Sequence, residues 1–305
     1  MHARTLALAV DLGGTKVAAA LVEDSGSVVA DSVHRAPTGR DAAREDIARA
    51  IVHVAGRALE KRAAHDRVVG IGIGSAGPVD LTRGAIAPLN LPALAGLEIV
   101  SLLGGVQPAV PIRLALDGTC IALAEHWRGA AAGSRNALAM IVSTGVGGGL
   151  IIDGRPVTGI SGNAGHIGQL RLRESVAGAP ATDGTLEALA SGPSAVAWAR
   201  AAGWSGSSGE ELAVSYSAGD PAAVAAVHRS AGAVGEAIAN VATLLDLDVA
   251  VVAGGFAQVS GDYLDVVRES AAGAAVFEYA RRVRISASGL DGHGPLIGAG
   301  ALVLR

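Results

Sequence analysis

Three side chains that could take part in phosphoryl chemistry are gathered near the start of the chain. Asp11 supplies a carboxylate, Thr15 a hydroxyl and Lys16 an ammonium, with Gly13 and Gly14 between them. Adjacent glycines allow a turn to adopt positive φ, and a bare turn presents successive backbone N–H groups to an anion. A carboxylate beside phosphate oxygens is useful when hydrated Mg²⁺ lies between them. The stretch predicts a phosphate site with Asp11 reaching Mg²⁺ through water, although alone it fits an exposed hairpin turn equally well.

A second glycine-rich turn, residues 143–149 (STGVGGG), repeats this pattern later in the chain. Strand-length apolar runs flank it, as they flank the first turn. It is not a P-loop, because no Gly-Lys-Ser/Thr follows the glycines. It is not a dinucleotide fingerprint either, because a strand rather than a helix comes next. The matched pair predicts a duplicated architecture in which two lobes hold a nucleotide between them.

The composition favours a globular protein of two domains. The chain has 305 residues, of which 50% are apolar and 17% charged, so it can bury more than one core. The formal net charge of −4 gives no electrostatic footprint for nucleic acid or for an anionic membrane. The single cysteine, Cys120, is expected to be a small packed side chain in a reducing cytoplasm. We expect no signal peptide and no membrane-spanning segment.

The elements that must position these residues alternate between strands and helices, which is typical of an α/β fold built twice. Asp220 followed by Pro221 predicts the capped start of a long helix. Asp117 stands between a strand and a helix, so it is either a helix cap or a general base, and the cap is favoured at this point. Residues 204–209 are expected to form a flexible linker. Helices are expected over 41–62, 118–132, 187–202 with a break at 191–193, 220–245 and 295–304, and strands over 68–74, 112–116, 248–253 and 283–286.

With both turns, residues 72–80 (GIGSAGPVD) and residues 252–255 (VAGG) in view, the chain resembles the ROK family of sugar kinases. The resemblance covers nearly the whole length and preserves the order of motifs. It implies a duplicated ribonuclease-H-like, actin-like ATPase fold, with ATP and Mg²⁺ in a cleft between two lobes. The lobes are expected to be residues 1–116 with 290–305, and residues 117–289. The final helix is expected to pack against the first lobe.

The resemblance also implies roles for individual residues. Asp117 matches the general base, which reverses the preference for a helix cap. Asn90 and Glu187 match positions that contact sugar hydroxyls, and Gly77, His166 and Gln169 complete the predicted acceptor site. The implied nucleotide-binding residues are Asp11, Gly13, Gly14, Thr15 and Lys16 in the first turn, Thr144, Gly145, Gly147 and Gly148 in the second, and Gly254 and Gly255 beside the adenosine.

Three departures from the family pattern affect the acceptor site. The usual Asn-Asp-x-Asn is replaced by residues 116–119 (LDGT), and Leu116 cannot bond a hydroxyl. The usual Glu-x-Gly-His is replaced by residues 166–169 (HIGQ), so an imidazole stands for a carboxylate and an amide for a zinc-binding imidazole. Residues 178–185 have none of the cysteines of the zinc-containing members. We therefore expect no structural zinc.

An intact phosphate site beside a rebuilt acceptor site predicts a kinase whose acceptor is not ordinary glucose. The candidates are an N-acylated sugar, an unusual hexose or a C7-cyclitol. Two alternatives stay open: a catalytically silent homologue that retains nucleotide, and a ligand-sensing ROK transcriptional regulator. The regulator is disfavoured because the first strand begins at about Thr5, without room for a helix-turn-helix, and because no basic face is expected. The resembled family is commonly dimeric or tetrameric, so a homodimer or homotetramer is expected.

Overall fold

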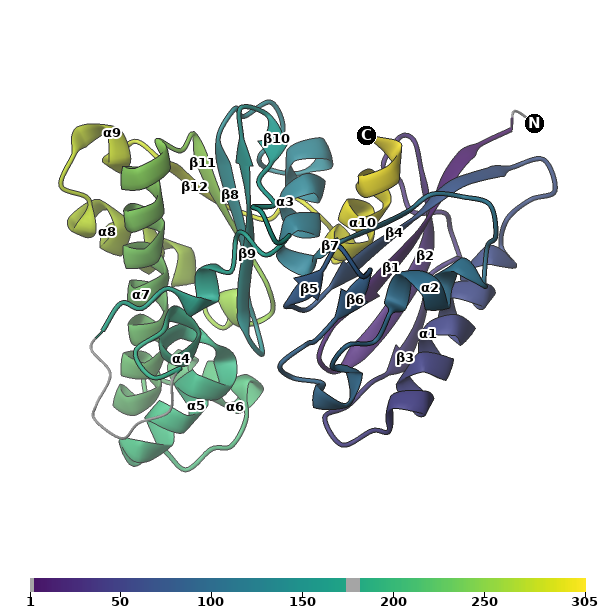
Figure 1. Cartoon of the computed structure of the whole chain (residues 1–305). Coiled ribbons are helices and arrows are strands. Elements are labelled where there is room, and N and C mark those ends of the chain that lie inside the picture. The colour runs from purple at the N-terminus through teal and green to yellow at the C-terminus, as the bar shows by residue number, and fades with distance from the viewer. Residues whose placement is uncertain (1–2, 174–181) are drawn as a thin grey trace. The chain divides into compact units, whose positions relative to one another are not determined.

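The computed structural model describes residues 3–173 and 182–305, and the chain separates into two compact units (Figure 1). The first comprises Met1–Ala132, Pro156–Gly165 and Gly289–Arg305, and the second Gly133–Arg155 and His166–Ser288. These limits differ from the expected lobes, because residues 117–132 and 156–165 belong to the first unit. The C-terminal helix lies in the first unit, as the resemblance implied.

The first unit is built on a five-stranded sheet in the order β3-β2-β1-β4-β7. Strand β1 pairs antiparallel with β2 and parallel with β4, and β4 pairs parallel with β7. The strands are β1 (Thr5–Leu12), β2 (Lys16–Glu23), β3 (His34–Pro37), β4 (Arg67–Ser75) and β7 (Ile112–Leu116).

Alternation along β1 gives this sheet one face of large side chains and one of small ones. Leu6, Leu8 and Val10 belong to the core cluster that includes α1 (Arg44–Leu59). Ala9 packs instead with Cys120 of α3 (Asp117–Arg128) and with Ala299 of α10 (Gly294–Leu304). Successive side chains of a strand point to opposite faces, so Asp11 lies on the same face as Ala9. The sequence LALAVDL therefore directs the carboxylate toward α3 and α10.

The α10 helix lies unusually close to this face because glycines remove the intervening side chains. A Cβ at Gly72 of β4 would stand 1.7 Å from Ala299 O, and a Cβ at Gly298 would stand 1.7 Å from Cys120 O. Carbon atoms cannot approach a carbonyl oxygen so closely, since nonbonded contacts are near 3.5 Å. Glycine at these positions is required for space, and the close packing fixes the start of α3 against the sheet.

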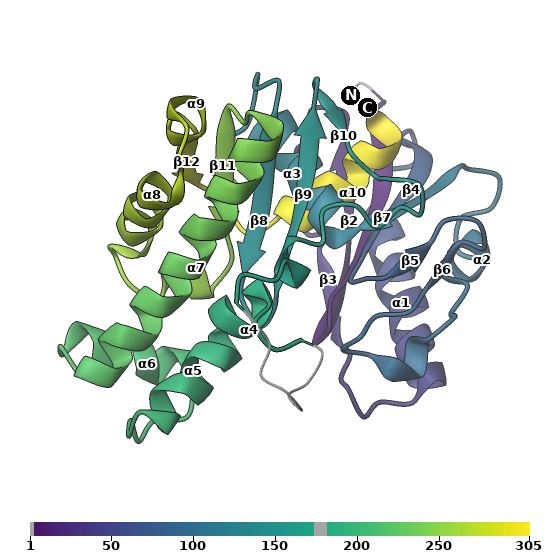
Figure 2. The ribbon, with the colours of Figure 1, turned by 60° about the vertical axis from the view of Figure 1, so that its left-hand side comes forward.

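The second unit repeats this plan with the order β10-β9-β8-β11-β12. Strand β8 pairs antiparallel with β9 and parallel with β11, and β11 pairs parallel with β12, so the predicted duplication is confirmed at the level of the sheets (Figure 2). The strands are β8 (Ala137–Val142), β9 (Val146–Ile152), β10 (Arg155–Pro156), β11 (Val249–Ala253) and β12 (Arg284–Ala287).

The long helix of the second unit begins where the sequence predicted. Asp220 accepts hydrogen bonds from the N–H groups of Ala222 at 3.0 Å and Ala223 at 2.9 Å, and Pro221 is the first residue of α7 (Pro221–Leu245). Helix α7 packs along α8 (Tyr263–Ala274). The remaining elements are β5 (Val79–Asp80), β6 (Ala85–Ile86), η1 (Pro92–Leu94), α2 (Ile99–Gly104), η2 (Ile167–Gln169), α4 (Leu186–Ala190), α5 (Gly192–Ala201), α6 (Gly209–Ser217), η3 (Phe256–Gln258) and α9 (Glu278–Arg281).

Residues 204–209 are not the flexible linker that their composition suggested. Trp204 is buried, and its indole N–H donates to Ser215 Oγ at 2.9 Å. A Cβ at Gly206 would lie 2.2 Å from the indole ring, so the chain wraps closely over that ring. The segment leads directly into α6, which the sequence analysis missed.

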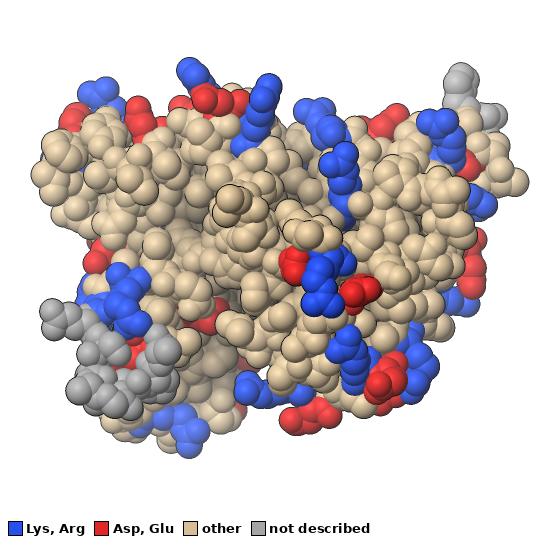
Figure 3. Space-filling model, viewed as in Figure 1, with Lys and Arg blue, Asp and Glu red and all other residues tan. Residues whose placement is uncertain are grey.

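No helix in the described ranges has the length and apolar character to cross a membrane. On the face shown in Figure 3, acidic and basic side chains are interspersed.

Candidate functional site

The predicted site residues are divided between the two units, and in the first unit two carboxylates lie near the same sheet edge. Asp11 pairs in register with Gly74 of β4, and Gly74 pairs with Ala115 of β7. Asp117 follows β7 directly and is the first residue of α3. The carboxyl ends of parallel strands are where α/β sheets bind ligands. The fold therefore brings Asp11 and Asp117 together at a position suited to chemistry.

The absence of a side chain at Gly74 makes room for Cys120 beside Asp11. A Cβ there would lie 3.8 Å from Asp11 Oδ1 and 3.0 Å from Cys120 Sγ. Cys120 is fully buried, and burial raises the pKa of its thiol, helped by the nearby Asp11 and Asp117. A thiol held neutral is a poor nucleophile, so Cys120 is a packed side chain, as expected.

Asp117 uses one carboxylate oxygen to support the start of its own helix. Its Oδ1 accepts the Gly118 N–H at 2.7 Å. The residue is inside the helix rather than at the N-cap, which is Leu116. The positive end of the α3 dipole favours a carboxylate at this place. Asp117 therefore supports the start of α3 from within its first turn, and its role as general base stays a prediction.

The electrostatics of Asp11 are strongly perturbed. Burial, and secondarily the charge of Asp117, raises the pKa of the Asp11 carboxyl to about 7, against the lowering effect of Lys16. A carboxyl with such a pKa titrates near neutral pH. Perturbed pKa values of this kind are typical of functional sites.

We expect this carboxyl to make the protein less stable as pH rises. Between pH 3.8 and about 7 the folded protein holds a proton that the unfolded chain releases, so the free energy of unfolding falls across this window, by up to roughly 4 kcal/mol. Asp11→Asn should remove that fall and unfold at higher denaturant than wild type at pH 8. Urea denaturation at pH 4 to 8 measures it, with exposed Asp24→Asn as the control. Equal pH slopes for wild type and Asp11→Asn would contradict the prediction.

The first glycine turn differs from expectation in its backbone. Neither Gly13 nor Gly14 has a positive φ, so the predicted reason for these glycines was wrong. Space is the reason at Gly14, where a Cβ would stand 3.1 Å from Asn90 Cβ. The Gly13 N–H donates to Lys16 O at 3.0 Å, and Thr15 and Lys16 are exposed.

Two predicted acceptor residues lie beside this turn. Asn90 packs against Gly14, whose Cβ would stand 3.1 Å from Asn90 Cβ. The N–H of Leu89, the residue before Asn90, donates to Gly77 O at 3.3 Å. Asn163, from the segment 156–165, accepts the Val79 N–H and donates to Val79 O, both at 2.8 Å. The first unit therefore holds Gly77 and Asn90 close to the first glycine turn.

In the second unit, Glu187 is tied to the second glycine turn. Its Oε2 accepts the Val146 N–H at 2.9 Å, and a Cβ at Gly145 would be 2.7 Å from the same oxygen. Glycine at 145 therefore makes room for the carboxylate. Gly147 and Gly148 lie within β9, and Gly148 packs against Ile167 of η2. The contact between Glu187 and this turn joins segments that are 41 residues apart, so the sequence alone could not show it.

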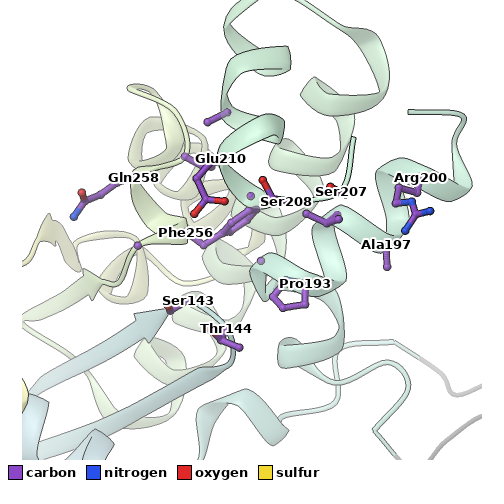
Figure 4. A pocket seen from close by; sticks show the side chains of 16 residues that line it. Ser143, Thr144, Pro193, Ala197, Arg200, Ser207, Ser208, Glu210, Phe256 and Gln258 are labelled. Atoms are coloured by element: carbon purple, nitrogen blue, oxygen red, sulfur yellow. The ribbon is translucent and has the colours of Figure 1, made fainter. Parts of the chain in front are cut away.

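A pocket of about 730 Å³ opens beside this turn (Figure 4). Ser143 and Thr144 of the turn and Gly255 line it, so the structure brings two predicted nucleotide-binding segments together. Gly254 has φ +108°, and a Cβ there would be 2.3 Å from Val142 O, which makes glycine necessary. Figure 4 shows Ser207, Ser208 and Glu210 on another side of the pocket.

Several pocket residues were missed in the sequence. The predicted break at residues 191–193 is confirmed, because α4 ends at Ala190 and α5 begins at Gly192. Gly192 and Pro193 both line the pocket. A Cβ at Gly192 would stand 3.1 Å from the ring of Phe256, another lining residue. Ser208 caps α6 by accepting the Glu211 N–H at 3.2 Å. The Ser-x-x-Glu pattern of residues 208–211 was the available signal for that helix.

The altered acceptor positions are placed as follows. Leu116 is 2% exposed and belongs to the core of the first unit, so it makes no polar contact. Thr119 is buried, and its Oγ1 lacks a hydrogen-bond partner among the described residues. His166 precedes η2, where Gln169 is exposed.

The expected absence of zinc ligands concerned residues 178–185, of which residues 178–181 lie outside the described residues.

The proteins that this chain resembles in sequence and in structure include several sugar kinases. Kanosamine kinase from Amycolatopsis mediterranei is 31% identical over 274 residues, covering 87% of this chain and 88% of that protein. ROK hexokinase from Thermus thermophilus has a TM-score of 0.83 at 32% identity, over 98% of this chain and 97% of that one. The ROK family glucokinase from Streptomyces griseus, solved with glucose and AMPPNP, has a TM-score of 0.81 at 26% identity, over 98% and 99% of the chains.

These likenesses confirm the predicted α/β fold of the actin-like ATPase type. The profile of the ROK family matches residues 7–305, nearly the whole sequence. The chain therefore belongs to the ROK family.

Proposed function

We propose that this protein transfers the γ-phosphoryl group of ATP to a hydroxyl group of a sugar or sugar-like polyol. The observation that carries the proposal is the pair Asp11 and Asp117 at one sheet edge, beside a glycine turn. The relatives described above are named as kinases of sugars, and one was solved with glucose and a nucleotide analogue. Family, fold and local chemistry support the same reaction.

Asp117 is the proposed general base. It accepts the proton of the acceptor hydroxyl as that oxygen attacks the γ-phosphorus in line and the bond to the β-phosphate oxygen breaks. Its hydrogen bond to the Gly118 N–H orients the carboxylate. The products are the phosphorylated acceptor and ADP, and the proton is then released from Asp117.

The buried carboxyl of Asp11 suits a site for hydrated Mg²⁺. The free protein disfavours the ionised carboxyl at this position, and a cation would offset that cost. Mg²⁺ usually binds through one or two carboxylates, waters and phosphate oxygens. When bound, it would neutralise charge on the phosphates. Asp11 would hold it through water, while Gly13–Lys16 bind phosphate oxygens.

In the second unit, residues 144–148 and Gly254–Gly255 are proposed to bind the rest of the nucleotide. The pocket beside Thr144 and Gly255 has the size and mixed lining of a small-molecule site. We assign the adenosine of ATP to this pocket and the phosphates to the turn. Glu187, His166 and Gln169 are assigned to the acceptor.

The acceptor is proposed to differ from glucose. Leu116 is buried and apolar where the family pattern has asparagine, and positions 166 and 169 have exchanged their chemistry. ADP release should be measured with glucose, other hexoses, N-acylated hexosamines and C7-cyclitols. We expect the highest kcat/KM for a compound other than glucose. Glucose as the best substrate would overturn the altered-acceptor assignment while leaving the kinase proposal intact.

A catalytically silent, nucleotide-binding homologue is the second candidate. The Thr119 hydroxyl, which has no hydrogen-bond partner among the described residues, and the buried Leu116 favour it, because both stand where the family pattern has polar asparagines. Measurable ATP binding without ADP release from any acceptor in the panel would establish this alternative.

We also propose that the protein self-associates as a homodimer or homotetramer. Leu244, Val276 and Phe277 are 81%, 78% and 55% exposed in the second unit. Such apolar exposure is often covered by another subunit. Light scattering coupled to size exclusion tests this, and a monomer at micromolar concentration would contradict it.

A further inference from the structure

Two segments that form neighbouring walls of the pocket in Figure 4 are tied to each other outside the pocket. One wall is residues 207–213, at the start of α6, and the other is residues 255–259, around η3. Tyr216 lies one turn beyond the first wall on α6. Asp262 follows the second wall and immediately precedes α8.

The tie is a phenol–carboxylate contact with an imidazole beside it. Tyr216 Oη is 2.8 Å from Asp262 Oδ1 and 2.7 Å from Asp262 Oδ2, and its proton is donated to this carboxylate. His228 Nε2 of α7 lies 3.2 Å from the same phenol oxygen. Because the phenol has a single proton, the oxygen can accept from His228 when Nε2 carries hydrogen. Three helices therefore meet at one hydroxyl group.

The titration of these groups agrees with the contact. The hydrogen bond from Tyr216 is the main cause that lowers the pKa of Asp262. Burial, followed by the bond to Asp262, raises the pKa of Tyr216. The hydrogen bond thus joins a neutral phenol to an ionised carboxylate, which is stronger than a bond between neutral groups.

Each end of the tie is rigidly connected to its own wall. On α6, Ser215 accepts the Trp204 indole N–H, and Glu211 Oε2 accepts the Ser207 N–H at 2.7 Å. At the other end, Tyr263 follows Asp262, packs edge-on against Phe256 with ring centres 6.3 Å apart, and bonds Ser230 at 2.8 Å. We therefore expect a displacement at Tyr216 or Asp262 to reach side chains that line the pocket.

We propose that Tyr216 and Asp262 are positioning residues that hold the two pocket walls at the separation needed to bind the nucleoside part of the nucleotide. This inference rests on the proposed function, because it takes the pocket to be the nucleoside site. The two residues act through the walls and do not line the pocket themselves. The tie should thus set nucleotide affinity without altering the chemical step.

The test is the effect of Tyr216→Phe on ATP binding and on steady-state kinetics. We expect the Kd for the nonhydrolysable analogue AMPPNP, and the KM for ATP, to rise on the order of 3- to 10-fold. The kcat and the KM of the acceptor should stay within about twofold, since neither residue touches the reacting groups in the proposed mechanism. Asp262→Ala should match Tyr216→Phe, and Asp262→Asn, whose amide oxygen still accepts, should recover part of the affinity.

Tyr279→Phe is the matched control, because it also removes one phenol hydrogen bond, to Thr243 O at 2.6 Å, from a residue outside the pocket lining. It should leave the Kd unchanged. The double variant Tyr216→Phe/Asp262→Ala should bind no more weakly than either single variant. An unchanged Kd in Tyr216→Phe would overturn the tie and leave the kinase proposal intact. If wild type binds no nucleotide, the proposed function and the tie are both overturned.

Discussion

Asp117→Asn should lower kcat by about 10²- to 10⁴-fold while leaving AMPPNP binding unchanged. Asparagine has nearly the same shape, and its amide oxygen can still accept the Gly118 N–H that Asp117 Oδ1 binds. The start of α3 should therefore be preserved. The amide cannot take a proton from the acceptor hydroxyl, so the loss should fall on the chemical step.

Coupled ADP release with the best acceptor measures this effect, and AMPPNP titration shows that the nucleotide site is intact. Asp24→Asn is the control, since it neutralises an exposed carboxylate of the same unit at a turn. It should retain wild-type kcat. Equal turnover of wild type and Asp117→Asn would exclude Asp117 as the base.

Gly298→Ala should destabilise the protein by roughly 3–5 kcal/mol or more. The added Cβ would stand 1.7 Å from Cys120 O and 2.3 Å from the same carbonyl carbon. Both are backbone atoms of α3, so no rotamer change can relieve the overlap, and α10 or α3 must move. Because α3 begins at Asp117, we also expect activity to fall in whatever fraction stays folded.

Gly56→Ala provides the matched control, because Gly56 is also helical but has no atom within 4 Å of the added Cβ. It should stabilise the protein by about 0.5–1 kcal/mol through the better helix propensity of alanine. Urea denaturation of both variants separates steric overlap from propensity. Similar free energies of unfolding for Gly298→Ala and wild type would show that α10 does not pack on α3 at this distance.

Local sequence patterns were sufficient for most of the strands and helices. The alternation in β1 and the apolar run of β4 predicted strands, and Asp220-Pro221 predicted the start of α7, because caps and periodicity act within a few residues. Helix α6 was missed although residues 208–211 carry a capping box. The segment before this helix is rich in Ser and Gly, a composition that predicts a linker. In the structure, the segment is held in place because Trp204 is buried and hydrogen-bonded to Ser215.

The family, the duplicated plan and the types of side chain that could bind phosphate or accept a proton follow from the residues alone. Contacts between distant segments set which neighbours those side chains have. The pKa of Asp11 in β1 depends on burial and on Asp117, which lies at the junction of β7 and α3. Glu187 binds the Val146 N–H from a separate helix, and Gly298 is required only because α3 crosses α10 there. The burial of a side chain, its distance from other charges and the space around a Cβ all depend on segments that are far apart in the sequence. A local sequence pattern therefore does not predict them.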